Sequence, residues 1–418
     1  MTYLSNFIKK YSKLKTHRKL SKKDKLEFNT FEFIKIKKIF KKVKDQQSLL
    51  NNNNVWANLL PKSSLRLKKI DYFIRDKNFK KFTSHETIGR SYKDLSNTKN
   101  FIEGSIVIKL KNVIIKDNSL LALLNKNLSI MEIYGDDLWL NFRLNKWPVA
   151  HNFHLAKVKV DNEDIYKRVK IYSIEKKLLN IKHKAILLSP IVEDNFFHWI
   201  FDTMTKLYLF DKMPKLKNLP LILRKPLNKY QKEMFNIFGI KNKIILTNGK
   251  SFAAKDVLIP TIPSPPIYSR PAVIWLRKKF LSNIKMNKTH IKRIYISRSD
   301  ASHRKIINDR EISDFLKKYD FTTLVLSKMN LGDQINYFRN ADIIILPHGS
   351  GASHLLFAKK SCKIIELQSP SQINNMFCSL SKLIGCKYGF LIGDEKKNYN
   401  FNYNIDIKKL YKLLSKII

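Results

Sequence analysis

The chain has 418 residues, 44% of them hydrophobic, which is enough for the cores of two domains and excludes a short disordered or disulfide-scaffold protein. Its formal net charge of +46 predicts an anionic partner, although a Lys-, Asn- and Ile-rich composition could also place much of the lysine on a solvated surface. The cysteines Cys362, Cys378 and Cys386 have neither zinc spacing nor an even number, so we expect a reducing compartment. No apolar run reaches about 18 residues, so we expect neither a transmembrane helix nor a signal peptide.

Residues 1–54 are predicted to be a basic extension. Apolar residues recur at helical spacing over residues 4–14 and 36–43, with lysines between them. A basic amphipathic helix can lie on an anionic membrane surface, but the same stripes could equally pack on the protein's own body. The asparagines at positions 51–54 predict a linker.

The chain then changes from a β-rich pattern to an alternation of strands and helices. Residues 100–185 are predicted to be β-rich, with strands around Ile106–Ile108, Val113–Ile115 and Leu138–Leu140. From about residue 184, predicted helices alternate with apolar strands at Ala185–Leu188, Leu221–Leu223, Ile244–Leu246, Val257–Ile259, Ile294–Ile296, Thr323–Leu326, Ile343–Leu346 and Ile364–Leu367. This alternation predicts parallel sheets with both faces covered and ligands beyond the carboxyl ends of the strands. The proline-rich stretch Pro260–Pro266 predicts a hinge that is neither helix nor strand.

The first segment with chemical potential is Asn195-Phe-Phe-His-Trp-Ile-Phe-Asp202, which follows a predicted strand and opens a helix. His198 and Asp202 are four residues apart and therefore share one helical face. A carboxylate beside an imidazole fixes its tautomer and raises its basicity, which suits a general base. The alternative is a structural pair or a cap within an aromatic cluster.

The second segment is Arg293-Ile-Tyr-Ile-Ser-Arg-Ser-Asp-Ala-Ser-His-Arg304. A predicted strand delivers Ser297 and Arg298 at its carboxyl end, and the planar fork of arginine suits phosphate better than lysine does. The alternative for Arg298 is a surface ion pair. Asn308, Asp309 and Glu311 then begin a helix, where they are expected to act as caps.

The third segment is Ile343-Ile-Ile-Leu-Pro-His-Gly-Ser-Gly-Ala-Ser-His-Leu-Leu-Phe357, an apolar strand followed by His348 and small residues. Gly349, Ser350 and Gly351 let a ligand approach the backbone, and a helix is expected to begin near Ala352. The free N–H groups at a helix start suit a diphosphate. Glu366 ends the next predicted strand, where it could accept bonds from ribose or sugar hydroxyls; the alternative is a loop carboxylate that holds Lys363 or a backbone N–H.

The sequence offers little evidence for a metal site. It has no Asp-x-Asp pair, and the acidic clusters at 136–137 and 161–164 read as turns. His151 and His154 lack partner ligands. Cys362 has no oxyanion motif around it and is expected to be a buried small residue. We therefore predict neither a metal nor a cofactor.

Together the three segments resemble glycosyltransferase family 61, also known as the DUF563 group. The family pattern runs from an Asn-aromatic-aromatic-His-Trp…Asp helix, through Tyr-Ile-Ser-Arg with a following Asn-acidic-x-Glu, to Pro-His-Gly-Ala-Gly and Ile-Glu-Leu. The resemblance covers about residues 180–395. This chain departs from the pattern at Ser350, where alanine is usual, and at Ser353-His354, where Thr-Asn is common.

The resemblance implies a GT-B-like α/β fold in which two Rossmann-like lobes face a cleft. The expected parts are the extension over 1–54, an acceptor-side lobe over 55–262, a nucleotide-sugar-binding lobe over 263–395 and a C-terminal helix over 396–418. It further implies an inverting, metal-independent reaction in which His198 or Asp202 is the base. Ser297, Arg298, His348, Gly349, Ser350, Gly351 and Glu366 would hold the donor.

The expected function is transfer of a sugar from a nucleotide-sugar donor, foremost a UDP-sugar, to a glycan or lipid-linked glycan during capsule or surface polysaccharide synthesis. The enzyme would be cytoplasmic, with the basic extension holding it on the inner face of the cell membrane. The alternative is a basic nucleic-acid-binding protein without activity. No nucleic-acid-binding motif supports that alternative, and the basic residues are spread over the whole chain.

Overall fold

The computed structural model describes residues 26–34, 55–59, 106–116, 121–123, 128–130, 155–160, 166–174, 178–189, 194–248, 250–261, 269–287, 289–370, 373, 376–395 and 402–418. The helical stripes predicted over 4–14 and 36–43, the strand near Leu138–Leu140, the acidic clusters and the pair His151 and His154 lie outside these residues. Within the described part, no helix is long and apolar enough to cross a membrane.

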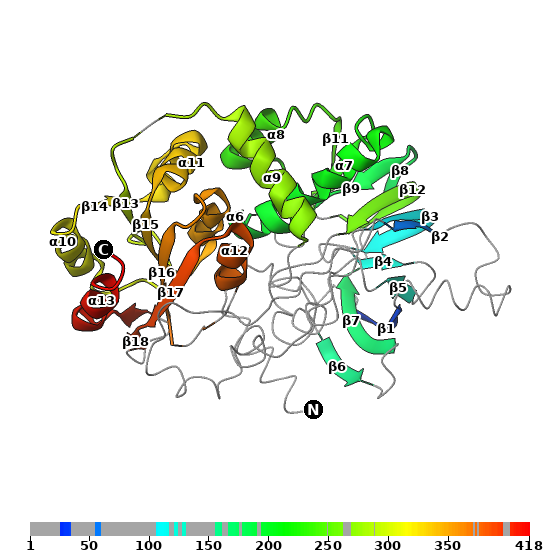
Figure 1. The fold of residues 1–418 in the computed structure, drawn as a ribbon. Helices are drawn as coiled ribbons and strands as arrows, with labels where there is room; N and C mark the ends of the chain where they lie inside the picture. Colours follow the sequence, from blue (N-terminus) through cyan, green and yellow to red (C-terminus); the bar gives the residue numbers. More distant parts are fainter. Residues whose placement is uncertain are drawn as a thin grey trace.

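The C-terminal half is a five-stranded parallel sheet with helices on both faces (Figure 1). In order across the sheet, the strands are β14 (Phe321–Leu324), β13 (Arg293–Ile296), β15 (Ile343–Pro347), β16 (Lys363–Gln368) and β17 (Lys387–Ile392). One face packs on α10 (Asp309–Lys317) and α13 (Ile407–Leu414), and the other packs on α11 (Leu331–Asn340), η6 (Ser350–Phe357) and α12 (Met376–Ile384).

Strand β15 illustrates why these apolar runs become central strands. Ile343 and Ile345 belong to the hydrophobic cluster around α10 and α13, whereas Ile344 and Leu346 belong to the cluster on the opposite face. Successive side chains of a strand point to opposite faces, so a strand buried on both sides must be apolar at every position. The sequence therefore reads as a continuous run rather than an alternation.

The preceding part of the chain forms a mixed sheet in the order β11-β10-β9-β12-β3-β2. Its strands are β2 (Val55–Leu59), β3 (Ile106–Lys116), β9 (Ala185–Leu187), β10 (Leu221–Leu223), β11 (Ile244–Leu246) and β12 (Phe252–Thr261), with β4 (Leu121–Leu123) beside β3 and β8 (Leu179–Ile181) beside β12. Strands β9 to β12 run parallel, and β3 is antiparallel to β12. The helical elements that follow β9 and β10 are α6 (Phe196–His198), η2 (Trp199–Thr203), η3 (Met204–Leu207), α7 (Tyr208–Lys212), η4 (Pro214–Leu216) and α8 (Lys229–Ile237).

A smaller sheet has the order β5-β1-β7-β6, formed by β1 (Leu26–Ile34), β5 (Leu128–Ile130), β6 (Leu155–Val160) and β7 (Tyr166–Ile174). Strand β1 lies within the predicted N-terminal extension, yet it pairs with β7 over its whole length. The remaining pair is β18 (Asp394–Glu395) with β19 (Tyr403–Asn404).

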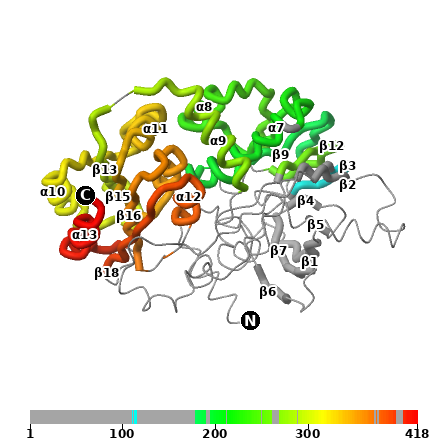
Figure 2. Tube along the Cα trace, in the orientation of Figure 1, coloured from blue at the N-terminus to red at the C-terminus, as the bar shows by residue number. Residues whose placement is uncertain are grey.

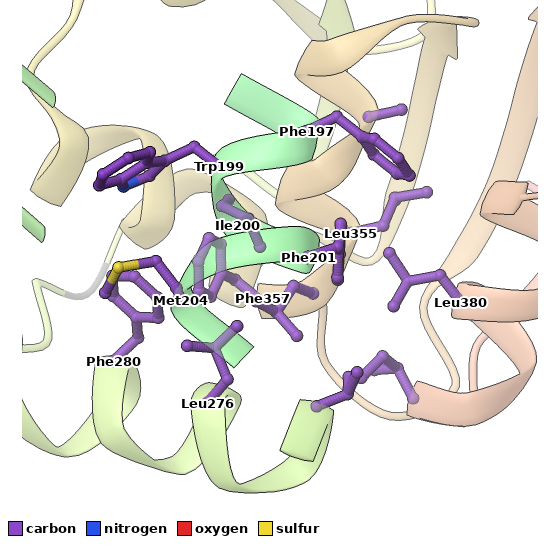
Figure 3. Packing of buried hydrophobic residues seen from close by; sticks show 14 of the residues in the cluster. Phe197, Trp199, Ile200, Phe201, Met204, Leu276, Phe280, Leu355, Phe357 and Leu380 are labelled. Carbon is purple, nitrogen blue, oxygen red and sulfur yellow. The ribbon is translucent and has the colours of Figure 1, made fainter. Parts of the chain in front are cut away.

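The two larger sheets share one hydrophobic core. Helix α9 (Arg270–Asn283) packs on both η3 and η6, and the tube of Figure 2 shows it between the two sheets. Figure 3 shows the side chains that meet there: Phe197, Trp199, Ile200, Phe201 and Met204 from the helix after β9, Leu276 and Phe280 from α9, Leu355 and Phe357 from η6, and Leu380 from α12. The aromatic segment after β9 is therefore the link between the halves.

Most of the predicted strands are confirmed, and two local predictions are wrong. The strand predicted at Thr323–Leu326 is Phe321–Leu324, because the apolar run continues past the strand into the short 3₁₀ turn η5 (Leu326–Lys328). The helix expected near Ala352 is confirmed as a 3₁₀ helix that begins at Ser350. Pro260 and Thr261, predicted to lie in a hinge, end strand β12. Pro260 pairs with Val107 of β3 beyond the end of β9, so the strand has an open side that tolerates a missing N–H.

Candidate active site

The C-terminal sheet has a topological switch point at β13. The chain passes from β13 to β14 on one side and then crosses to β15 on the other. In open parallel sheets, the loops at such a point separate and leave a crevice in which ligands bind. Arg298 follows β13 and His348 follows β15, so two predicted residues about fifty positions apart in the sequence lie on either side of this crevice.

The loop after β13 holds Ser297 in place through Asp309. Ser297 is buried, and its hydroxyl donates to Asp309 Oδ2 at 2.6 Å while Tyr295 donates to Asp309 Oδ1 at 2.5 Å. Asp309 therefore anchors the end of β13. Asn308 does not cap α10, as its side chain bonds the backbone of Ile405 instead.

Arg298 is a half-buried cation that forms no salt bridge within the described residues, and the nearby carboxylate of Asp300 affects its pKa less than burial does. Nη2 donates to the His303 carbonyl at 3.3 Å, while Nε is buried and has no hydrogen-bond partner. Burial lowers the pKa of its guanidinium, which still stays charged at neutral pH. The surface ion pair considered for Arg298 is absent from the described part of the chain. A cation held in this way is suited to an anionic ligand.

Gly349 lets the Arg298 guanidinium lie against the loop after β15. A Cβ built on Gly349 would lie 1.8 Å from Arg298 Nη1 and 2.8 Å from Cζ. Any side chain at this position would displace the guanidinium, so the glycine is required for the close approach. The predicted residues Arg298 and Gly349 are thus in contact.

His348 and Glu366 form a buried pair. His348 Nδ1 lies 2.5 Å from Glu366 Oε1, with the two side chains 6% and 0% exposed. Tyr388 donates its hydroxyl to Glu366 Oε2, and Gln368 Nε2 lies 3.2 Å from the Tyr388 oxygen. Both carboxylate oxygens of Glu366 are therefore bound by side chains of the protein. This arrangement fixes which nitrogen of His348 carries the proton.

A second arginine, Arg304, was overlooked in the sequence. Burial lowers its pKa, and the neighbouring charge of Arg298 lowers it further. Its backbone has φ 54°, a left-handed conformation that non-glycine residues avoid and that clusters at functional sites. Both arginines act electrostatically on the buried Tyr403. Burial raises the pKa of this tyrosine, and the two positive charges partly offset that rise. The sequence does contain a signal for Arg304. It is a second arginine, six positions after Arg298, in a chain whose basic residues are mostly lysine.

A cavity of about 570 Å³ opens over this crevice, within the size range of small-ligand sites. The C-terminal half contributes Ser297, Arg298, Ser350 and Gly351, together with residues of η5 and α11. The preceding half contributes Phe196 from α6 and residues of α8. The cavity thus lies between the two sheets, with Arg298 and Asp300 of the β13 loop on one side and Ser350 and Gly351 of the β15 loop beside them.

The segment Asn195–Asp202 begins with the predicted helix and continues as a π-helix. The Asn195 side chain caps α6 by accepting from the backbone N–H groups of Phe197 at 2.9 Å and His198 at 3.4 Å. Residues Trp199–Thr203 then form a π-helix, a rare conformation that is frequent at functional sites. His198 Nδ1 lies 2.7 Å from Asp202 Oδ2, so the predicted pair exists. Neither residue is part of the lining of the 570 Å³ cavity.

Phe196 and His354 connect this segment to the loop after β15. Their rings stack at 4.6 Å with an interplanar angle of 11°, and Tyr230 of α8 packs edge-on against Phe196 at 5.2 Å. His354 Nδ1 donates to the Gly351 carbonyl at 2.9 Å, and burial lowers its pKa to about 4. His354 is therefore neutral at pH 7 and holds the glycine-containing turn.

Within the described residues, we find neither a reactive cysteine nor a metal-binding cluster that would make a second catalytic site. Cys362 and Cys378 are buried, and burial raises the pKa of both thiols, so they behave as small apolar residues. Across the described ranges, no group of three His, Cys, Asp or Glu side chains could hold a metal ion.

Comparisons with known proteins agree with the resemblance read from the sequence. Residues 196–365 match the family model described as glycosyltransferase 61. A Drosophila melanogaster protein, EGF domain-specific O-linked N-acetylglucosamine transferase, is 28% identical over 159 residues. That alignment covers 34% of this chain and 30% of the relative, so it spans less than a third of the relative's length. The region matched by the family model contains the helix after β9, the Arg298 loop and the His348 loop.

Proposed function

Since residues 196–365 match the family model of glycosyltransferase 61, we propose that the protein transfers a sugar from a nucleotide-sugar donor to a glycan acceptor. The observation that carries the proposal is the half-buried Arg298 guanidinium against Gly349 at the switch point of a parallel sheet. A diphosphate is the anion that this site fits, because two loops supply a planar cation and a backbone without side chains. The mixed α/β fold with its cavity between two sheets supports a two-lobed GT-B-like arrangement.

The proposed reaction is a single displacement with inversion. The acceptor hydroxyl oxygen attacks the anomeric carbon, the bond from that carbon to the diphosphate oxygen breaks, and the hydroxyl proton passes to a base. The nucleoside diphosphate leaves with the bonding electrons. Arg298, His348 and the backbone of Gly349 to Gly351 would stabilise its growing negative charge without a metal. Arg304 would add a second positive charge beside Arg298.

The roles of the remaining predicted residues follow from their contacts. Glu366 would act through His348 rather than on ribose, because both its oxygens are already bound. Ser297 would position the Arg298 loop through Asp309. His198 and Asp202 stay our candidates for the base, since their contact at 2.7 Å would hold the imidazole in one tautomer. They lie on the half that faces the donor loops, and closure of the two halves would bring an acceptor between them.

The cellular setting is proposed on charge alone. A net charge of +46 would favour an anionic membrane surface, where a lipid-linked acceptor for capsule or surface polysaccharide is found, and would place the enzyme on the cytoplasmic face. Flotation with anionic liposomes, before and after removal of residues 1–25, which leaves strand β1 in place, tests this proposal. Unchanged binding of the truncated protein would exclude the N-terminal segment as the anchor.

Calorimetric titration of UDP, GDP and CMP and their common sugar conjugates tests the donor site. Wild type should bind one nucleotide, and Arg298→Ala should lose about ten- to hundredfold in affinity, as expected for a charge-assisted bond. Arg310→Ala is the matched control, because that side chain is 96% exposed on α10. Equal affinity of the Arg298→Ala variant and wild type would refute the assigned site.

The high positive charge also favours a second candidate function, nucleic-acid binding without catalysis. Salt-sensitive binding to duplex DNA or RNA, together with no binding of any nucleotide or sugar nucleotide, would replace the transferase proposal with this one.

A further inference from the structure

The loop after β14 forms a second wall of the cavity beside the Gly349–Gly351 turn. Leu326, Ser327 and Met329 of this loop line the cavity, as do Leu331 and Gln334 of α11. The two loops are in direct contact, because a Cβ built on Gly351 would lie 3.2 Å from Leu326 Cδ1. This wall is mostly apolar, whereas the adjoining wall carries Arg298.

Gln334 is held in one orientation by this loop. Its Nε2 donates to the carbonyl oxygens of Leu326 at 2.8 Å and Met329 at 3.0 Å. The reverse orientation would place Oε1 against two carbonyl oxygens and is therefore excluded. Both N–H groups of the amide are thus used. Within the described part of the chain, Oε1 accepts no hydrogen bond, so a cavity-lining side chain keeps a fixed, unused acceptor.

The sheet order places this wall on the nucleoside side of the proposed donor site. The diphosphate would lie between the loops after β13 and β15, where Arg298 and Gly349 meet. Strand β14 is the next strand across from β13, about 4.8 Å away. In sheets with this switch point, the rest of a nucleotide extends from the phosphates over the end of the neighbouring strand. The apolar side chains of Leu326, Met329 and Leu331 suit the faces of a planar base.

We propose that Leu326, Met329, Leu331 and Gln334 form the nucleoside subsite of the donor, and that Gln334 Oε1 accepts the ring N–H of a uracil or guanine base. This inference rests on the proposed function. Uracil carries that proton on N3 and guanine on N1. In cytosine and adenine the corresponding ring nitrogen has a lone pair, which would face the lone pair of Oε1. The site therefore selects UDP- or GDP-sugars over CDP- and ADP-sugars.

The first test compares calorimetric affinities of the full chain for inorganic pyrophosphate, UDP, GDP, CDP and ADP. Either UDP or GDP should bind at least about tenfold tighter than CDP, ADP and pyrophosphate. If all four nucleotides and pyrophosphate bind equally, the anion site stands and the nucleoside subsite is refuted. If CDP or ADP binds best, the assigned hydrogen bond is refuted. If nothing binds, the proposed function fails, and this inference fails with it.

The second test removes the proposed hydrogen bond between Gln334 Oε1 and the base, first by changing the ligand and then by changing the protein. Wild type should bind 3-methyl-UDP, or 1-methyl-GDP if GDP is the ligand, about three- to tenfold more weakly than the unmethylated nucleotide. Gln334→Leu should no longer distinguish the two and should bind pyrophosphate as wild type does. Gln334→Lys is the matched control, since its ammonium group can still donate to both loop carbonyls but has no acceptor, and it should lose the distinction as Gln334→Leu does. Retention of the distinction by Gln334→Lys would mean that Gln334 only holds the loop.

Discussion

His354 makes the stability of the site depend on pH in a direction that can be calculated. Its ring is 2% exposed and stacked on Phe196, and burial lowers its pKa from 6.5 to about 4, against a smaller opposing effect of the bond to Gly351. In the unfolded chain, His354 is protonated as the pH falls below 6.5. In the folded protein, it is protonated only near pH 4. The contribution of His354 to stability is therefore complete above pH 6.5 and is lost as the pH falls toward 4.

The difference of about 2.5 units between the unfolded and folded pKa of His354 sets the size of the stability loss, since each unit corresponds to about 1.36 kcal/mol. At pH 4.5 about 2.5 kcal/mol of the free energy of unfolding should be lost relative to pH 7 through this side chain alone. The replacement His354→Asn removes the titrating group and retains a side-chain N–H for the Gly351 carbonyl.

Urea unfolding followed by tryptophan fluorescence at pH 7 and pH 4.5 measures this effect. Carboxylates also titrate in this range, so the informative quantity is the difference in pH dependence between wild type and His354→Asn. We expect the variant to lose about 2.5 kcal/mol less than wild type between the two pH values. His290→Asn, at an exposed position, should behave as wild type. A pH dependence of His354→Asn equal to that of wild type would refute the reasoning.

Two substitutions test the contacts around the donor loops. Tyr388→Phe leaves Oε2 of the fully buried Glu366 without its donor, so the free energy of unfolding should fall by about 1.5–3 kcal/mol, and nucleotide affinity should fall as His348 loses its support. A melting temperature and affinity both equal to wild type would contradict the assigned chain of hydrogen bonds. Gly349→Ala places a methyl group where the Arg298 guanidinium lies, so calorimetry should show at least about tenfold weaker nucleotide binding. Because a flexible side-chain end can move aside, its melting temperature should stay close to wild type, and a large drop would point to a backbone role instead.

The sequence was sufficient for strands β13, β15 and β16 of the C-terminal sheet and for the residues that cluster at its edge, whereas β14 was placed two residues late and β17 was not predicted. Strands buried on both faces must be apolar throughout, so the runs around Ile294, Ile344 and Ile364 are legible without a structure. The bounds of β14 were predicted wrongly because the apolar run continues beyond the strand. Leu326 belongs to this run but lies in the cavity wall.

Local chemistry by itself therefore determined the α/β class, the family 61 resemblance now matched over residues 196–365, and the identity of Arg298, His348 and the glycines as candidates. Only the tertiary structure decided what each side chain touches. The order of the strands places Arg298 against Gly349 and links Glu366 to both His348 and Tyr388. The physical reason is that apolar runs and glycine turns are properties of a few consecutive residues. Contacts across a sheet depend on which strands become neighbours and on their register.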